Sequence, residues 1–447
     1  MKFRLDAIRE CFEGVIPAIM ATAGPDGVPN VAYLSQVHFI DARRIALSYQ
    51  FFNKTRQNIL INPLASLLVT NPATVAQYRL SLRFSHTETS GQIFEEMKAK
   101  LAGIASHTGM SSVFRLLGSD IFEVLEIEAV AGDTLPAAPP QRNLLAALRI
   151  CTQRISACGD LERLLGEALH GLHRYLDIEH AMLLMTDASC DRLYTVASHG
   201  YQESGIGSEI PFGRGVIGVA AREMTPIRIG HMNSEYAYSR AVKQNTKLSG
   251  WEGPFDPEIP LPGLPESRSQ LAVPIAAGQK LLGILYVESP QDLRFSYDDE
   301  DALVAFCAHL GMALHTLQRA ADETDETAAG ESAPQAPSGP VLAVRHFAEN
   351  DSIFLGDEYL IKGVAGAIFW ALMRDYVDQR RIAFTNRELR LDARICLPDI
   401  SDNLEARLIL LVRRLAERGA GVGIEKTGRG RFRLSVTRPV QLLEMPA

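Results

Sequence analysis

The hydrophobic positions in the first third of the chain fall into short runs separated by turn residues such as Pro25-Asp26-Gly27. Short apolar runs bounded by turns are typical of β-strands. The predicted strands are Val15 to Thr22, Asn30 to Ile40, Ile45 to Tyr49, Ala65 to Thr70 and Ile121 to Val130. Their close spacing predicts a small antiparallel barrel, with one helix between Gly91 and Gly118.

The middle of the chain mixes helical and strand patterns, which predicts an α/β domain. The expected helices are Asn143 to Cys158, Leu161 to Leu176 and Asp298 to Leu317. The expected strands are His180 to Thr186, Leu193 to Ser198, Gln270 to Ala276 and Lys280 to Glu288. Two of the helices repeat apolar residues at a 4-3-4-3 spacing that suits helix-on-helix packing between subunits. These seams are Leu144, Leu148, Cys151, Ile155 and Cys158, and Leu303, Cys307, Leu310, Leu314 and Leu317.

The last hundred or so residues combine short strands, helices and a closing hairpin. Thr385-Asn386-Arg387-Glu388 has the form of a capping box, so a helix should begin there. The other expected elements are strands Val341 to Phe347 and Ser352 to Leu355, helices Val364 to Tyr376 and Asn403 to Glu417, and hairpin strands Val422 to Lys426 and Phe432 to Val436. In the helix over Asn403 to Glu417, the pattern predicts a buried leucine stripe with Arg407 and Arg414 on an exposed side.

Two linkers divide the chain. Prolines interrupt Ala131 to Arg142, and Ala320 to Pro340 has five acidic residues, three prolines and no large apolar residue. Such a segment cannot bury enough surface to offset its ordering entropy, so a flexible tether is expected. The predicted domains are residues 1–135 and 143–319, a linker over 320–340, and a third domain over 341–447.

Composition is ordinary for a folded chain, at 47% hydrophobic and 22% charged residues. No apolar run reaches the roughly 18 residues of a membrane span, and the charged residues near the N-terminus lead us to expect no signal peptide. Six cysteines without a CxxC pair favour a reducing, cytoplasmic location and no zinc site.

The net charge is −8, but residues 341–447 carry +3 and the rest −11. A localised basic segment predicts contact with a polyanion.

The segment Phe51-Phe52-Asn53-Lys54-Thr55-Arg56-Gln57-Asn58 follows the strand Ile45 to Tyr49 and opens a short helix. A cationic helix N-terminus can bind a phosphate, although a solvated basic turn would have the same pattern. With its strand order, this region resembles the FMN-binding split barrels of the pyridoxamine-phosphate-oxidase-like superfamily over about Phe12 to Val130. The resemblance implies a homodimer with FMN at the interface, held on its phosphate side by Ser48, Lys54, Thr55 and Asn58.

Haem is the alternative cofactor of the barrel, since some split barrels bind haem. His86 and His107 flank the predicted helix and are candidate axial ligands, or surface residues of no such role. No catalytic residue and no metal site is predicted.

The motifs PFGRGVIGVAA, TPIRIG, SQLAVPI, KLLGILYVES and FSYDDEDALVAFCAHLGMAL resemble GAF domains over about Asn143 to Gln318. The resemblance implies a small-molecule effector held between the sheet and a lid, here His231 to Arg268. Tyr236, Tyr238, Trp251 and Phe255 lie in this lid, where they could stack on a planar ligand or pack on one another. The cysteines of the helical seams, Cys151, Cys158 and Cys307, are candidates for a thiol redox sensor or small buried hydrophobes.

The strands, helices and GRGRFRL hairpin of the C-terminal segment resemble the winged helix-turn-helix output domain of two-component response regulators over about Val341 to Val436. That family's roles would place Arg407, Arg413 and Arg414 on a recognition helix in the major groove of double-stranded DNA, and Arg429 and Arg431 in the wing. A basic face that binds another protein is the competing interpretation.

Together these patterns predict a one-component, ligand- or redox-responsive transcriptional regulator that acts as a homodimer. Two alternatives remain open at this stage. One is a flavin-dependent oxidoreductase regulated by its GAF domain, and the other is a haem-based gas sensor.

Overall fold

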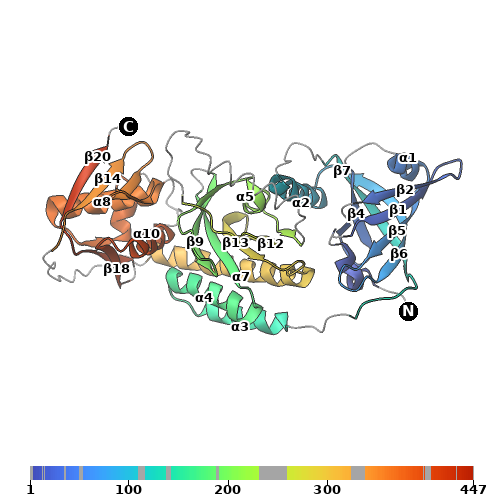
Figure 1. The fold of residues 1–447 in the computed structure, drawn as a ribbon, viewed down its shortest axis with the longest axis horizontal. Helices are drawn as coiled ribbons and strands as arrows, with labels where there is room; N and C mark the ends of the chain where they lie inside the picture. Colours follow the sequence, from blue (N-terminus) through green and yellow to red (C-terminus); the bar gives the residue numbers. More distant parts are fainter. Residues whose placement is uncertain are drawn as a thin grey trace.

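The structure is a computed structural model. It describes residues 4–12, 14, 16–34, 37–49, 54–108, 116–136, 142–187, 191–230, 259–323, 338–395, 397, 404–428 and 430–445. Three parts follow one another along the long axis of the molecule (Figure 1). We call them the barrel (η1 to β7), the middle part (α3 to α7) and the C-terminal part (β14 to β20).

The barrel is a seven-stranded antiparallel sheet with the order β2-β1-β5-β6-β7-β4-β3. Its elements are η1 Leu5–Phe12, β1 Ala18–Ala23, β2 Pro29–Leu34, β3 Val37–Phe39, β4 Arg44–Tyr49, α1 Lys54–Ile61, β5 Leu64–Thr70, β6 Gln77–Glu88, α2 Gln92–Thr108 and β7 Gly118–Ala129. One large cluster of fully buried side chains, including Met20, Leu67 and Phe122, fills it. The fold is therefore a split barrel, as the strand pattern predicts.

One strand prediction for the barrel was wrong in detail, and one strand was not predicted. The run Asn30 to Ile40 is two strands, because β2 pairs with β1 whereas β3 pairs with β4. The long strand β6, which pairs with both β5 and β7, has no counterpart among the predicted strands. Its alternation of Tyr78, Leu80, Leu82 and Phe84 with polar residues is a period-2 signal that could have identified it.

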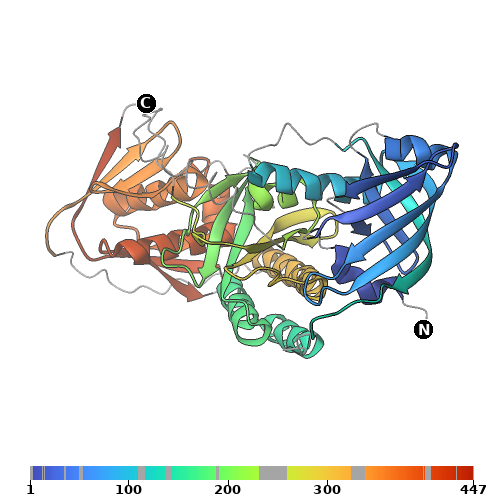
Figure 2. The ribbon, with the colours of Figure 1, turned by 45° about the vertical axis from the view of Figure 1, so that its right-hand side comes forward.

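The middle part is a six-stranded antiparallel sheet with the order β10-β9-β8-β13-β12-β11. Its elements are α3 Leu144–Ser156, α4 Leu161–Leu176, β8 His180–Asp187, β9 Arg192–His199, β10 Glu209–Pro211, α5 Gly215–Glu223, β11 Ile227–Ile229, β12 Ser269–Ala277, β13 Lys280–Ser289 and α7 Tyr297–Glu323. Helices α3, α4 and α7 cover one face of the sheet, and α5 packs on the other face (Figures 1 and 2).

The helical seams face the interior of a single subunit. Cys151, Ile155, Leu303, Cys307 and Leu310 are all at most 1% exposed and belong to the core between α3, α4, α7 and the sheet. The prediction that these residues pack against a second subunit was therefore wrong. The same spacing arises whenever a helix buries one stripe, whether its partner is another chain or the chain's own sheet.

The C-terminal part has mixed α and β structure. It has a four-stranded sheet with the order β16-β15-β14-β20 and a three-stranded sheet with the order β17-β19-β18, and the helices α8 to α10 lie between β16 and β18 in the chain. The elements are β14 Leu342–Phe347, β15 Ser352–Leu355, β16 Glu358–Ile361, α8 Gly363–Gln379, β17 Ala383–Thr385, α9 Asn386–Leu391, α10 Leu404–Arg418, β18 Val422–Gly428, β19 Arg431–Val436 and β20 Val440–Met445. The capping box at Thr385 and Glu388 is formed, as predicted. Strand β20, which pairs in parallel with β14, was not predicted.

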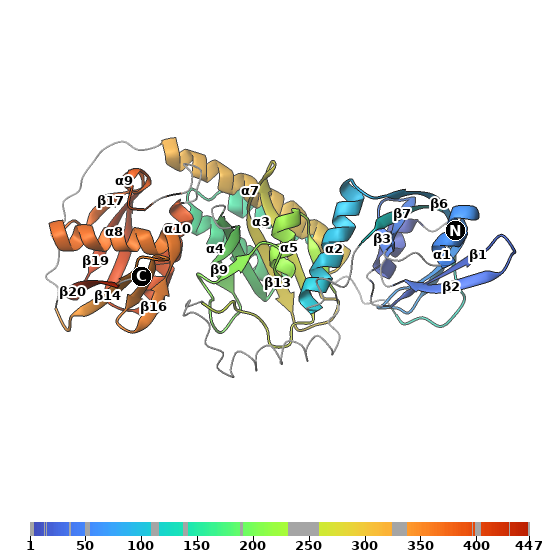
Figure 3. The ribbon, with the colours of Figure 1, turned by 90° about the horizontal axis from the view of Figure 1, so that it is seen from above.

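Helix α7 runs along the middle part from the side of the barrel toward the C-terminal part (Figure 3). It begins at Tyr297, beside the barrel, and continues to Glu323, past the predicted end of the helix at Leu317. The predicted linker therefore begins within a helix.

Among the helices that the structure describes, none combines the length and the apolar character needed to cross a bilayer.

Helix α7 lies so close to the sheet that Gly311 leaves no room for a side chain. A Cβ atom on Gly311 would lie 2.2 Å from the carbonyl oxygen of Ala276 on β12. On α4, by contrast, nothing lies within 4 Å of the equivalent position at Gly166. We expect Gly311→Ala to lower the free energy of unfolding by about 2 kcal/mol or more, because the helix must move off the sheet.

Gly166→Ala is the matched control for this prediction. It should leave the stability unchanged or raise it by about 0.5–1 kcal/mol, because alanine restricts the unfolded chain. Urea denaturation monitored by circular dichroism measures both variants. Equal midpoints for the two variants would contradict the close approach of α7 and β12.

Candidate functional site

Helix α1 carries three of the four residues predicted to hold a cofactor phosphate. Lys54 is exposed at its first position, whereas Thr55 and Asn58 are buried. The Nδ2 atom of Asn30 donates to Thr55 Oγ1 at 2.9 Å, and Asn58 Nδ2 donates to Thr22 Oγ1 at 3.1 Å. Thr55 and Asn58 thus hold α1 against β1 and β2, and Lys54 is left as the cation at the helix N-terminus.

The fourth predicted residue, Ser48, lies on β4 opposite Ser119 of β7. Ser119 is fully buried, and its hydroxyl makes no hydrogen bond to any described residue. An unsatisfied buried hydroxyl is uncommon in folded proteins and calls for an explanation. The Ser119 hydroxyl is therefore a hydrogen-bond donor that lies beside β4, the strand that precedes α1.

Arg56 of α1 is held in a polar cluster at the same edge of the barrel. Its guanidinium forms an ion pair with the buried Asp120 and donates to Thr87 Oγ1 at 3.2 Å, and Thr87 Oγ1 donates to Asp120 at 2.6 Å. The guanidinium carbon also lies 3.7 Å from the centre of the Tyr49 ring. Because these contacts engage Arg56, Lys54 is the better placed of the two cations for an incoming anion.

Apolar side chains are exposed on the elements around α1. They are Val28, Val31 and Tyr33 on or beside β2, Leu60 and Ile61 at the end of α1, and Leu64 at the start of β5. Tyr33 is 77% exposed and Ile61 63%. An exposed apolar patch beside a polar site is typical of a surface that another molecule covers.

The histidines proposed as haem ligands gain no support from the structure. His86 is exposed near the C-terminal end of β6. Its Nε2 lies 3.4 Å from Glu88 Oε1, and its Nδ1 lies 3.0 Å from Ser85 Oγ. The side chain of His107 lies outside the described residues.

The middle part carries a polar cluster on the sheet face that bears α5. His180 of β8 pairs with Glu288 of β13, and Tyr201 follows β9 with its ring 5.5 Å from that of His180. Glu288 is 2% exposed and accepts hydrogen bonds from the Leu264 amide at 3.0 Å and from Tyr286 at 3.3 Å. Sequence analysis missed these residues because no spacing along the chain links them.

Two buried polar atoms face this cluster. His180 Nδ1 has no hydrogen-bond partner among the described residues, and the Tyr201 hydroxyl lies beside Glu288, to which it can donate. Burial raises the pKa of Tyr201, and the negative charge of Glu288 raises it further, so the hydroxyl stays protonated and can donate. Unsatisfied donors and acceptors near a buried carboxylate are suited to a small polar ligand. The predicted lid residues Tyr236, Tyr238, Trp251 and Phe255 lie outside the described residues.

The three cysteines of the helical seams have raised pKa values, so their thiols are mostly protonated and weakly reactive. Burial raises the pKa of Cys151 to about 11, and it also raises the pKa of the fully buried Cys307. The pKa of Cys158 is raised as well, by burial and by Glu167, and its thiol donates to the Arg154 carbonyl at 3.4 Å. Since the thiolate is the reactive form, these cysteines behave as small buried hydrophobes.

Helix α10 carries the three arginines predicted to contact DNA, and it lies against the middle part. The expectation that Arg407 and Arg414 are exposed was wrong, because they are 4% and 5% exposed. Arg407 Nη2 lies 2.8 Å from Asp187 at the end of β8, and Arg413 donates to the Val196 carbonyl of β9 at 2.6 Å. Arg414 donates to the Leu360 carbonyl at 3.1 Å and to Glu417 at 2.8 Å.

The hairpin of β18 and β19 remains at the surface beside α9. Asn386 donates its backbone amide to the Gly430 carbonyl at 2.8 Å, so the hairpin tip touches the start of α9. Lys426 and Arg431 lie on this hairpin, and Arg429 lies outside the described residues.

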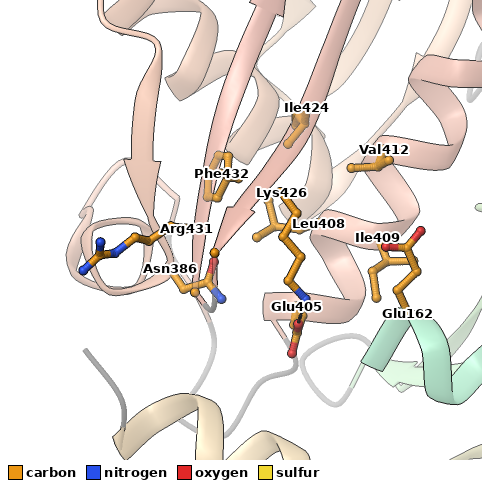
Figure 4. Close-up of a pocket in the computed structure, with 12 residues that line it drawn as sticks. Glu162, Asn386, Glu405, Leu408, Ile409, Val412, Ile424, Lys426, Arg431 and Phe432 are labelled. Atoms are coloured by element: carbon orange, nitrogen blue, oxygen red, sulfur yellow. Dashed lines mark hydrogen bonds and ion pairs between the residues drawn. The ribbon is translucent and has the colours of Figure 1, made fainter. Parts of the chain in front are cut away.

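A groove of about 470 Å³, open to solvent, runs from Asn386 and Arg431 past α10 to Glu162 on α4 (Figure 4).

Two family models match the chain. Residues 5–130 match the pyridoxamine 5'-phosphate oxidase model, and residues 160–314 match the GAF domain model. The chain therefore contains a pyridoxamine-phosphate-oxidase-like split barrel followed by a GAF domain. From here on, the middle part is called the GAF domain.

Individual relatives are distant or match a short stretch. An uncharacterized protein of Methanocaldococcus jannaschii is 43% identical over 54 residues, which is 12% of this chain, and the chain spans 36% of that relative's length. The GAF domain of an Acinetobacter phosphoenolpyruvate-protein phosphotransferase is 21% identical, with 40% of this chain and 96% of that chain covered and a TM-score of 0.31. An FMN-binding protein from Syntrophomonas wolfei is 19% identical, with 28% and 84% covered and a TM-score of 0.25.

The contact between the barrel and the GAF domain contains a buried histidine. His38 lies 3.6 Å from Glu96 on α2, with a side chain 9% exposed. Burial lowers the pKa of His38 below 6.5, although Glu96 opposes this. A histidine with a lowered pKa binds fewer protons when folded than when unfolded, so it destabilises the folded state as the pH falls below about 6.5.

We expect the thermal midpoint of the barrel to fall between about pH 7.5 and pH 5.5, where an unfolded histidine gains its proton. His38→Gln should show a smaller fall over the same range. Differential scanning calorimetry of the full chain measures both proteins. An identical fall in the variant would contradict the buried, neutral state of His38.

Proposed function

We propose that the protein is a one-component transcriptional regulator, in which a flavin-binding barrel and a GAF domain control a winged-helix DNA-binding domain. The observation that carries the proposal is the arrangement of the C-terminal part. Three helices, α8 to α10, are followed by the hairpin β18–β19, and β17 adds to that hairpin beside β19. Helices followed by a two-stranded wing are the parts with which winged-helix proteins contact duplex DNA.

The charge of the hairpin supports this proposal. Lys426 is exposed on β18, and Arg431 and Arg433 lie on β19. Arg387 is exposed on α9, whose first residue touches the hairpin tip. Cations on a hairpin and on an adjacent helix end would contact the phosphates on either side of a groove.

The two front domains supply the signals in this proposal. A small polar effector would bind the GAF domain at His180, Tyr201 and Glu288, where the buried His180 Nδ1 has no hydrogen-bond partner in the part of the chain that the structure describes. FMN would lie with its phosphate at Lys54 and the N-terminus of α1, while Thr55 and Asn58 hold that helix in place. A second subunit would cover the apolar patch around Tyr33 and Ile61. The flavin, when bound, supplies a redox-active ring.

DNA binding is tested with Arg431→Ala in the full chain. Loss of one phosphate contact should weaken binding to different duplexes by a similar factor and reduce the slope of log K against log salt by about one. Fluorescence anisotropy at several salt concentrations measures both quantities. Arg43→Ala, which removes an exposed arginine of the barrel, is the control. An unchanged affinity and an unchanged salt slope in Arg431→Ala would contradict this position for the DNA phosphates.

Flavin binding is tested with Lys54→Ala. Removing the ammonium group at the phosphate should weaken FMN binding by about tenfold or more, in line with the 1.5–3 kcal/mol of a hydrogen bond to a charged group. Riboflavin has no phosphate, so its weaker affinity should be unchanged in the variant. Lys98→Ala, which removes an exposed lysine paired with Glu95, is the control. Equal losses for FMN and riboflavin would contradict this position for the phosphate.

The competing proposal is a flavin-dependent oxidoreductase regulated by the GAF domain. The match of residues 5–130 to the pyridoxamine 5'-phosphate oxidase family favours it. Steady turnover of a reduced pyridine nucleotide or of a pyridoxine phosphate by the flavin-loaded chain, together with an absence of DNA binding, would establish it in place of the regulator.

A further inference from the structure

Helix α10 is buried on two sides. Its leucine stripe, Leu404, Leu408, Leu411 and Leu415, packs into the C-terminal part. On another side the helix meets β9 of the GAF domain and the loop that follows it. A Cβ atom on Gly207 of this loop would lie 3.6 Å from Leu410 Cδ1 and 3.8 Å from Arg414 Cδ. The helix therefore packs directly on the backbone of the loop.

The GAF domain offers oxygen atoms to the cations of the C-terminal part. Asp187 pairs with Arg407 at 2.8 Å, and the Val196 carbonyl accepts from Arg413. Glu209 lies 3.8 Å from Lys362, which precedes α8. The Arg407 guanidinium also lies 4.4 Å from the centre of the Tyr194 ring. The phosphates of DNA would offer negatively charged oxygens to the same side chains, as the carboxylates of Asp187 and Glu209 do here.

We infer that the GAF domain masks the recognition helix, so that α10 binds either the GAF domain or DNA but not both. The inference rests on the proposed DNA-binding function. The side chains of Arg407 and Arg414 are 5% and 6% exposed in this arrangement, so duplex DNA cannot reach them. Binding in the major groove requires the C-terminal part to move away from β8 and β9.

The masking contact has the composition of a reversible interface. Its ion pair between Arg407 and Asp187 is buried, and a buried pair adds little net stability because both charges lose water. Breaking such a pair by removing one partner is costly, because the remaining charge is then buried alone. Loss or reversal of the charge of Asp187 should therefore open the contact.

The loop that contacts α10 begins in the proposed effector site. Tyr201 lies at its start, beside His180 and Glu288. Ser204, three residues later, donates to Glu417 of α10, and Gly207 lies under Leu410 and Arg414. Binding of an effector at Tyr201 would thus displace the segment on which α10 rests. This short path of packed residues couples the GAF ligand to release of the recognition helix.

Asp187→Lys in the full chain tests the inference. The lysine places a positive charge beside Arg407 and should open the contact. We expect its affinity for a fluorescent duplex of about four helical turns, taken from upstream of the chain's own gene, to rise at least tenfold at low salt. Small-angle X-ray scattering of the DNA-free protein should show a larger radius of gyration than that of the wild type.

Glu167→Lys is the matched control, because it reverses a carboxylate that pairs with Arg154 at 2.7 Å within the GAF domain. It should leave both the affinity and the radius unchanged. Equal affinity of the wild type and Asp187→Lys, whether or not the radius changes, would overturn the masking while leaving DNA binding intact. If Asp187→Lys has a larger radius of gyration than the wild type but does not bind the duplex, the proposed function is overturned, and the inference with it.

Discussion

A helix with apolar residues on two faces must be buried on both, and this constraint on α10 determines how the C-terminal part meets the rest of the chain. The run Leu408-Ile409-Leu410-Leu411-Val412 extends the apolar surface of α10 beyond a single stripe. The C-terminal part covers one face and the GAF domain covers another. Arg407 and Arg413, which flank this run, lie in the same contact, where Asp187 pairs with Arg407 and the Val196 carbonyl accepts from Arg413.

A second helix joins the barrel to the GAF domain. On α2, Met97 and Leu101 pack with Ala46 and Ile121 of the barrel, whereas Ala99 is buried among the side chains around α5. Ion pairs reinforce this junction, since Arg9 of η1 pairs with Asp298 and Asp301 at the start of α7. A change at β4, where the flavin site is proposed, would thus reach the GAF domain through packed side chains, and rigid packing transmits such shifts well.

The sequence predicts local structure well and long-range contacts poorly. The capping box at Thr385 and the paired strands β12 and β13 follow from short-range patterns, and both are present. The 4-3-4-3 seams correctly identify buried stripes but not their partner, because spacing does not specify what covers a stripe. The burial of Arg407 was missed although the five apolar residues after it indicate a helix that is buried on more than one face. The cluster of His180, Tyr201 and Glu288 depends on strand pairing, which no local pattern encodes.

The central claim is that DNA and the GAF domain compete for the same side of the C-terminal part. Lys362 and Glu209 lie 3.8 Å apart across that contact, close enough for a zero-length carbodiimide crosslink between amine and carboxylate. The most direct measurement is the yield of this crosslink, by mass spectrometry, in the wild-type chain with and without saturating duplex DNA. The account predicts that the crosslink forms in the free protein and is lost when DNA is bound. A yield that saturating DNA leaves unchanged would contradict it.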